Sequence, residues 1–141
     1  MGTKENEQKK KYLRSYRRLE HHADRLEQEI EAIRARYTGH AITYSDMPKA
    51  NNIAHDLSEY AAQVDELLAD VVRLRTEAVQ AYRQIAKDIE ALDDVTEREL
   101  MRYRYIYGMT WQEVADAMHY TDRWVRILHG RALAHFKNSS F

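Results

Sequence analysis

Two long runs of apolar side chains, spaced alternately three and four residues apart, restrict the fold of this chain more than any other feature. The first run consists of Tyr16, Leu19, Ala23, Leu26, Ile30, Ile33 and Tyr37. The second consists of Leu57, Tyr60, Val64, Leu67, Val71, Leu74, Ala78, Ala81 and Ile85, with Leu92 one heptad further on. This spacing places each run on one stripe of a helix, as in the seam of a coiled coil. We therefore expect an all-α chain that begins with a long antiparallel helical hairpin (coiled coil).

The scarcity of helix-breaking residues supports this expectation. The 141 residues include four glycines and one proline, which are the residues that most often interrupt helices. Gly39 and Pro48 lie between the two runs, where Gly39 can end the first helix. The segment 42–48 contains Ile, Tyr and Met, which favour burial, so we expect an ordered connection there.

The second predicted helix carries more apolar surface than one partner helix can cover. Beside its main seam runs a second stripe, made up of Ala61, Leu68, Val72, Val79, Tyr82 and Ile89. A helix with so wide an apolar face needs a further partner. The partner is either the C-terminal part of the chain or another copy of it, and we favour a homo-oligomer, with a dimer as the preferred form.

The polar beginning of the chain and the change of pattern at residue 96 give the predicted domain limits. Residues 1–11 are polar and include three consecutive lysines, which predicts a flexible tail. Residues 12–95 then form the hairpin and oligomerisation part, and residues 96–141 form a separate domain. The first residues lack the apolar stretch of a secretory signal, and no apolar run reaches the roughly 18–20 residues that a membrane span requires. We expect a cytoplasmic protein with no membrane partner.

The last 46 residues have the pattern of a helix-turn-helix. Thr96 to Glu99 and Thr110 to Glu113 both read as capping boxes, in which a hydroxyl and a carboxylate satisfy free amides at a helix start. Gly108 separates the two helices that these boxes begin, and His119-Tyr120 predicts a tight turn before a last helix capped by Thr121. The expected inner face of that helix consists of Val125, Leu128, Ala132, Leu133 and Phe136. Two short capped helices in this order predict a helix-turn-helix.

This module is the predicted contact with double-stranded DNA. Residues 96–141 carry seven basic and five acidic residues, whereas residues 1–95 carry 15 and 18. In a helix-turn-helix the second helix enters the major groove, where Arg can read guanine, which makes Arg123 and Arg126 the best candidates for base contacts. The amides near Thr121 can bind a phosphate. Phosphate contacts are also expected from Thr110, Gln112, Arg131 and Lys137.

The same residues resemble known families. The stretch from Tyr105 to Ala115 (YIYGMTWQEVA), followed by Tyr120 to Arg126 (YTDRWVR), resembles the region-four helix-turn-helix of sigma-70-type factors. Together with Leu128 to Leu133 (LHGRAL), and with ITYSDMPK from Ile42 and DLSEY from Asp56, it is similar to a phage family of late-gene transcriptional regulators, the RinA and ArpU group.

These resemblances imply a regulator of phage or prophage genes that works through host RNA polymerase. The sigma pattern also implies base-reading positions at Asp122, Arg123 and Ile127. Ile127 departs from the polar residue usual in that pattern, and Gly130 is an unusual residue inside such a helix.

Two other functions remain open at the level of sequence. A small-terminase type of DNA-recognition subunit, from a phage packaging machine, also joins a helix-turn-helix to a helical hairpin. A protein-interaction adaptor would explain the modest positive charge of the module. The seven His residues show no metal-binding spacing, and neither a Gly-rich phosphate loop nor a nucleophile elbow occurs, so we predict no cofactor, no metal and no enzyme activity.

Overall fold

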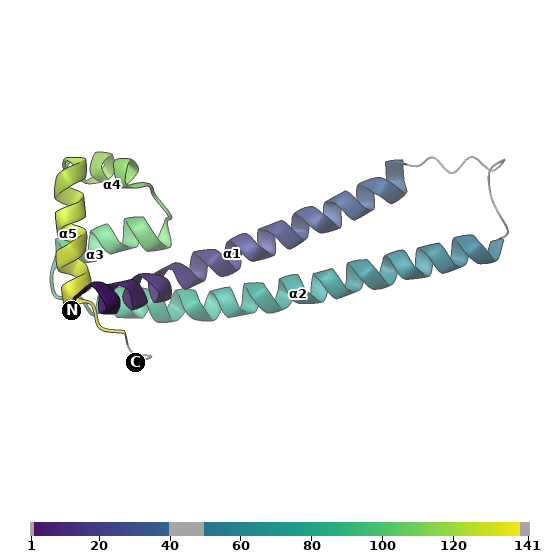
Figure 1. The fold of residues 1–141 in the computed structure, drawn as a ribbon, viewed down its shortest axis with the longest axis horizontal. Coiled ribbons are helices and arrows are strands. Elements are labelled where there is room, and N and C mark those ends of the chain that lie inside the picture. Colours follow the sequence, from purple (N-terminus) through teal and green to yellow (C-terminus); the bar gives the residue numbers. More distant parts are fainter. Residues whose placement is uncertain (1, 40–49, 139–141) are drawn as a thin grey trace. The chain divides into compact units, whose positions relative to one another are not determined.

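The computed structural model describes residues 2–39 and 50–138, and this part of the chain is helical without a strand (Figure 1). Its elements are α1 (Gly2–Gly39), α2 (Ala50–Glu90), α3 (Val95–Met101), the π-helical segment η2 (Arg102–Ile106), α4 (Trp111–Met118) and α5 (Asp122–His135). The predicted all-α fold, with two long helices followed by short ones, is confirmed. The expected ordered connection at residues 42–48 lies outside the described residues.

The chain divides into two compact units. One, called here the C-terminal unit, consists of residues 1–19 and 77–141, and the other, the middle unit, consists of residues 20–76. The domain boundary predicted at residue 95 lies inside the C-terminal unit. The reason is that the beginning of α1 and the end of α2 share a hydrophobic core with the short helices, and a sequence gives no local sign of such long-range packing.

In the middle unit, α1 and α2 run antiparallel and pack through the predicted seam. Ile30 and Val71 are buried there, and the rings of Tyr37 and Tyr60 lie 4.4 Å apart between centroids. Near the other end of this unit the Arg75 guanidinium binds three carboxylates of α1, at 2.5, 2.8 and 2.9 Å, which belong to Glu20, Asp24 and Glu27. Hydrogen bonds to Glu27 and then to Asp24 raise the pKa of Arg75, so its charge is fixed.

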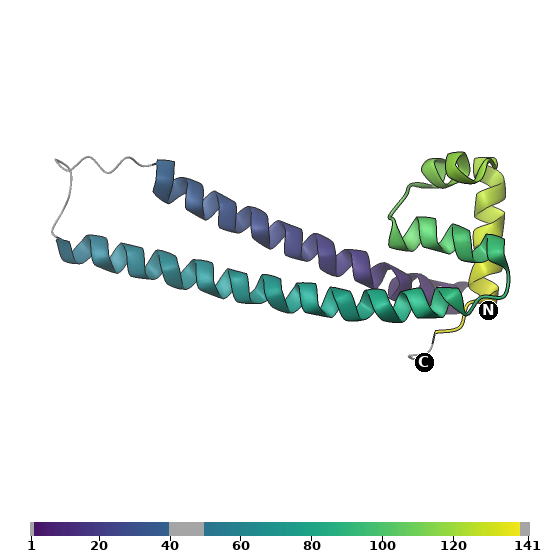
Figure 2. The same cartoon turned by 180° about the vertical axis from the view of Figure 1, so that it is seen from behind.

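The core of the C-terminal unit draws on every element. Leu13 of α1 and Ile85 of α2 have no exposed surface, and they pack in one cluster with Leu100, Val125 and Phe136. Figures 1 and 2 both show the beginning of α1 beside the end of α2 and next to the C-terminal end of α5. The short helices therefore pack on the end of α2, which directly precedes them, and on the beginning of α1, which is far away in the sequence.

The first residues of α1 are helical, which corrects the predicted flexible tail over residues 1–11. The Lys9 side chain is buried and its Nζ donates to the backbone oxygen of Leu133, 2.6 Å away, at the end of α5. Glu5 lies one turn earlier, 3.5 Å from the same Nζ. A carbonyl at a helix C-terminus has no partner within the helix and attracts cations, so a lysine fits there.

The turns between the short helices follow the sequence closely. Thr110 and Thr121 cap α4 and α5, each hydroxyl accepting from the amide three residues later. Gly108 and His119, with φ of 70° and 59°, adopt the left-handed conformation that ends the helical segments before them. The cap of α3 was predicted wrongly: Asp94, and not Thr96, accepts from the amide of Glu97, so the helix begins earlier than the capping box suggested.

The second apolar stripe of α2 is largely exposed. Its exposed large members are Leu68, Val72, Val79 and Tyr82, whereas Ile89 is buried in the core of the C-terminal unit. Leu57, which was expected in the main seam, is also half exposed. The C-terminal module thus covers only the last part of the stripe.

Candidate nucleic-acid interface

Helices α4 and α5 form a tight helix-turn-helix. The amide of Tyr120 donates to the backbone oxygen of Ala115 over 2.9 Å, which closes the turn. Ala115 and Val114 of α4 and Val125 of α5 are almost completely buried at this junction. The small side chain of Ala115 lets the two helices approach closely.

Helix α5 has one buried face and one exposed face. Its buried side chains are Val125, Leu128, His129, Ala132 and Leu133. Its exposed face carries Arg123, Trp124, Arg126, Ile127, Gly130 and Arg131. The structure therefore brings five of the predicted contact residues together, namely Asp122, Arg123, Arg126, Ile127 and Arg131, on or beside one accessible surface. A positively charged helix face of this kind can enter the major groove of B-DNA.

Arg126 is held in place by neighbours on both sides. Its Nε lies 2.9 Å from Oδ2 of Asp122, one turn earlier, and its Cζ lies 5.8 Å from the centroid of the Trp111 ring. The side chains of the ion pair are about half exposed, and such pairs contribute less than about 1 kcal/mol. Arg126 can therefore leave Asp122 for a base or a phosphate at small cost.

The remaining predicted contact residues either have hydrogen-bond partners within the chain or lie away from the exposed face of α5. Thr110 and Thr121 are exposed but their hydroxyls serve as helix caps, and the amide of Trp124 is already bonded to Thr121. Gln112 is exposed and its side-chain amide lies 3.2 Å from Asp116. Lys137 follows the C-terminal end of α5 and lines a separate acidic pocket, so the structure does not bring it to the surface that Arg123 and Arg126 share.

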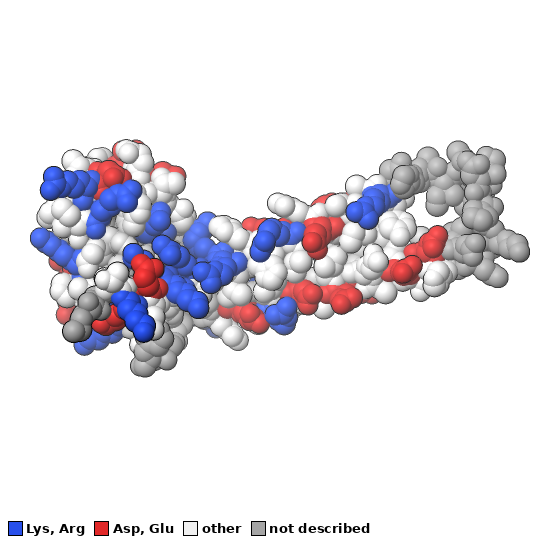
Figure 3. All heavy atoms as spheres, viewed as in Figure 1, with Lys and Arg blue, Asp and Glu red and all other residues white. Residues whose placement is uncertain are grey.

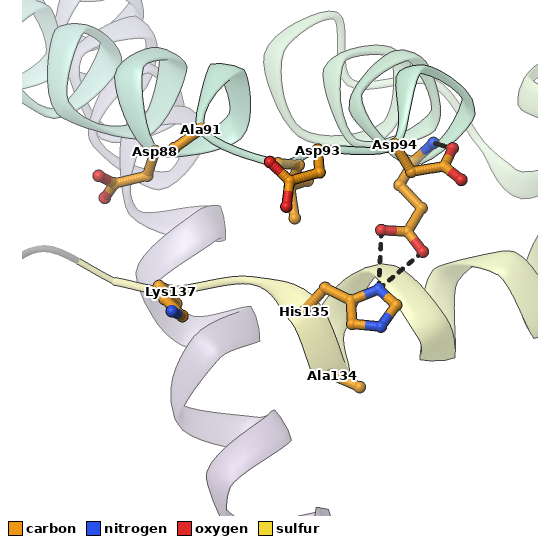
Figure 4. A pocket seen from close by; sticks show the side chains of 9 residues that line it. Asp88, Ala91, Asp93, Asp94, Ala134, His135 and Lys137 are labelled. Atoms are coloured by element: carbon orange, nitrogen blue, oxygen red, sulfur yellow. Dashed lines mark hydrogen bonds and ion pairs between the residues drawn. The ribbon is translucent and has the colours of Figure 1, made fainter.

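The acidic pocket is a structural feature of the C-terminal unit. Figure 4 shows Asp88, Asp93 and Asp94 on one side and His135 and Lys137 on the other. Nδ1 of His135 lies 2.9 and 3.0 Å from the two oxygens of Glu97, which is buried. This contact joins α3 to the end of α5. Among the described residues, no group of three potential ligands is arranged to hold a metal ion.

Arg104 and Trp111 belong to the interface although sequence reasoning did not select them for it. The Arg104 Cζ lies 4.4 Å from the centroid of the Trp111 ring, and its Nη1 donates to the backbone oxygen of Met109 over 2.8 Å. Burial lowers the pKa of Arg104, and the nearby charges of Arg14 and Arg126 lower it further. No periodic pattern could reveal this contact, because it depends on the π-helical turn and on the loop before α4.

A buried polar pair, Tyr105 and His129, lies at the buried face of α5. The Tyr105 hydroxyl and Nε2 of His129 are 2.7 Å apart, and the ring centroids of His129 and Trp111 are 4.6 Å apart. Burial lowers the pKa of His129 to about 4, with Lys10, Arg104 and Arg14 contributing. His129 is therefore neutral at pH 7, and its hydrogen bond with the Tyr105 hydroxyl holds it in the core, away from the exposed face of α5.

Comparison with known proteins identifies the same segment. Residues 91–138 match the family model "Sigma-70, region 4", a DNA-binding region of the helix-turn-helix type. Searches of curated proteins and of solved structures found no match. Over residues 2–39 and 50–138, none of the helices has both the length and the apolar character needed to cross a membrane.

Proposed function

We propose that this chain is a sequence-specific DNA-binding transcriptional regulator of phage or prophage origin, which places the exposed face of α5 in the major groove. The observation that carries the proposal is the exposure of Arg123 and Arg126 on a helix whose opposite face is buried. The match of residues 91–138 to a DNA-binding region supports the same function.

The proposed contacts fall into two classes. Arg123 and Arg126, with Asp122 before them and Ile127 after them, face the bases, because they lie in the N-terminal half of α5. Thr110, Gln112, Thr121 and Arg131 lie at the edges of this face and contact phosphates. Lys137 has no part in our proposal, because it lies in the acidic pocket.

Selection of bound duplexes from a random pool, with the full chain, tests the proposal. It should yield a defined site, and Arg126→Ala should then lose about 1–3 kcal/mol of preference at one base pair. Arg83 offers a matched control, since it is also an exposed arginine of the C-terminal unit but lies on α2. Arg83→Ala should leave both affinity and preference unchanged. Recovery of random sequence only would contradict sequence-specific binding.

We further propose that the protein acts as a dimer in the cytoplasm of a bacterial host and contacts the host RNA polymerase. The exposed stripe residues of α2, such as Val72 and Val79, support self-association because apolar side chains at helical spacing favour a partner. In a dimer the two α5 helices would be linked, so that binding of one raises the effective concentration of the other at the DNA and increases the affinity. Light scattering should give a dimer, whereas a ring of eight or more copies would favour a subunit of a packaging machine. Transcription in vitro with purified host RNA polymerase tests the proposed contact with that enzyme.

A further inference from the structure

The beginning of α1 supplies the positive charge of the C-terminal unit. Residues 1–19 contain seven Lys and Arg against two acidic residues, whereas residues 77–141 contain nine against ten. Without α1 the helix-turn-helix unit would carry a net charge of −1, and with it the unit carries +4. A surface that binds DNA needs cations near the phosphates, so the first turns of α1 change what this unit can bind.

These cations are held in fixed positions by the buried side of α1. Leu13 is completely buried in the core, the Tyr12 hydroxyl donates to Asp88 over 2.5 Å, and the Tyr12 ring packs on Phe136 with 6.1 Å between centroids. Lys9 is bonded to the end of α5, as described above. The part of α1 that carries the neighbouring arginines is therefore fixed against the helix-turn-helix.

One of these arginines, Arg17, faces the loop that leads into α4, and Arg14 lies three residues earlier on the same side of α1. The Arg17 guanidinium lies directly against Gly108, where a larger side chain would collide with it. Arg14 lies close enough to Arg104 and to His129 to disfavour their charged forms. Arg104 in turn lies on the ring of Trp111, and the guanidinium of Arg126 also lies near this ring. A series of guanidinium groups thus extends from α1 to the exposed face of α5.

The cluster formed by Arg14, Arg17 and Arg104 has no carboxylate partner among the described residues. Glu7, the acidic residue that also lies near Tyr105, is paired with Lys10 at 3.2 Å. Figure 3 shows blue Lys and Arg side chains gathered over the beginning of α1 and the short helices. Like charges held together without a counter-ion repel one another, and an anion placed between them relieves the repulsion.

We propose that Arg14 and Arg17 of α1, together with Arg104 of η2, form a phosphate-binding cluster that grips the DNA backbone beside the groove occupied by α5. The proposal rests on the proposed function. The guanidinium fork matches a phosphate and can bind it through two parallel hydrogen bonds. The cluster borders Gly108 and Met109, immediately before the start of α4, and in helix-turn-helix proteins the first helix crosses the backbone at this place. The hairpin therefore takes part in DNA binding directly.

A salt titration of the full chain with a labelled duplex tests the cluster. Each phosphate contact contributes about 0.9 to the slope of log affinity against log salt concentration. The double variant Arg14→Ala, Arg17→Ala should therefore lower the slope by about 2 and weaken binding roughly 10- to 100-fold at about 0.1 M salt. The loss should be the same for the selected site and for an unrelated duplex, because phosphates carry no sequence information.

Two control variants separate the cluster from other effects. Arg14→Lys, Arg17→Lys keeps both charges and should keep most of the slope, and Arg83→Ala should behave as the wild-type chain. Circular dichroism and the urea midpoint of the double alanine variant test whether it is folded. A wild-type slope in the folded double alanine variant, while Arg126→Ala still loses its base preference, would overturn the cluster alone. Failure of the wild-type chain to bind any duplex would overturn both proposals.

Discussion

The burial of Leu13 offers a direct test of whether the beginning of α1 is part of the C-terminal unit. Leu13 lies on α1, has no exposed surface, and belongs to the same core cluster as Val125 and Phe136. If this packing exists in solution, Leu13→Ala must destabilise a helix-turn-helix that lies more than 80 residues away in the sequence. A flexible tail that reached to residue 11, followed by an independent hairpin, would give no such coupling.

The magnitude follows from the environment of the side chain. Truncation of a fully buried leucine costs about 2–5 kcal/mol, through lost transfer energy and the cavity left behind. With a urea dependence of about 2 kcal/mol per molar, the unfolding midpoint should fall by about 1–2.5 M. Both tryptophans of the chain, Trp111 and Trp124, lie in the C-terminal unit, so tryptophan fluorescence reports the unfolding of this unit.

Leu57→Ala is the matched control. Leu57 is half exposed and lies in the middle unit. Its truncation should change the free energy of unfolding that tryptophan fluorescence reports by less than about 0.5 kcal/mol. A Leu13→Ala variant that unfolds with the midpoint of this control would refute the composite unit. It would also remove the physical basis for ordered arginines on α1.

Three further predictions follow from local geometry. Gly108→Ala should destabilise the protein by about 1–2 kcal/mol, because φ is 70° there and the Arg17 guanidinium fills the space, whereas Gly130→Ala should stabilise it by about 0.5–1 kcal/mol, because its surroundings within α5 are open. Equal effects in urea unfolding would contradict this. Since burial lowers the pKa of His129 to about 4, the folded state binds that proton less readily than the unfolded state, and stability should fall by up to about 3 kcal/mol as the pH drops from about 6.5 toward 4. The stability advantage of the wild-type chain over His129→Gln should shrink over this range, and an advantage that stays constant would count against a buried neutral imidazole. Arg75→Ala should lower the helix stability of the middle unit by about 1 kcal/mol at low salt, through loss of three carboxylate contacts, and less at high salt. Thermal unfolding followed by circular dichroism measures this effect, and salt independence would speak against it.

Features that depend on neighbouring residues could be predicted from the sequence. Thr110 and Thr121 were identified as caps because their partners lie three residues away, and Gly108 was placed correctly because it has to end a helix. The buried face of α5 followed from its spacing. Asp94 was missed because two residues near the start of α3 can each cap it, and the difference between them depends on the preceding loop.

Features that depend on long-range packing could not be predicted in this way. The polar composition of residues 1–11 favours a tail, but the Lys9 side chain donates to a backbone carbonyl 124 residues further along the chain. Leu13 packs into a core to which every element of the unit contributes. Arg104 lies in the π-helical segment η2, and its contact with Trp111 follows no periodic pattern of the sequence. The part that the arginines of α1 play in the C-terminal unit could not be predicted for the same reason, because their neighbours lie far away in the sequence.

The measurement that tests the central claim most directly is an anisotropy titration of the full chain against a labelled duplex over a range of salt concentrations. We predict binding at about 50 mM salt and a linear fall of log affinity with log salt concentration, as phosphate contacts require. Absence of binding to every duplex at that salt concentration would contradict this prediction. The exposed arginine-bearing face of α5 would then have a partner other than DNA.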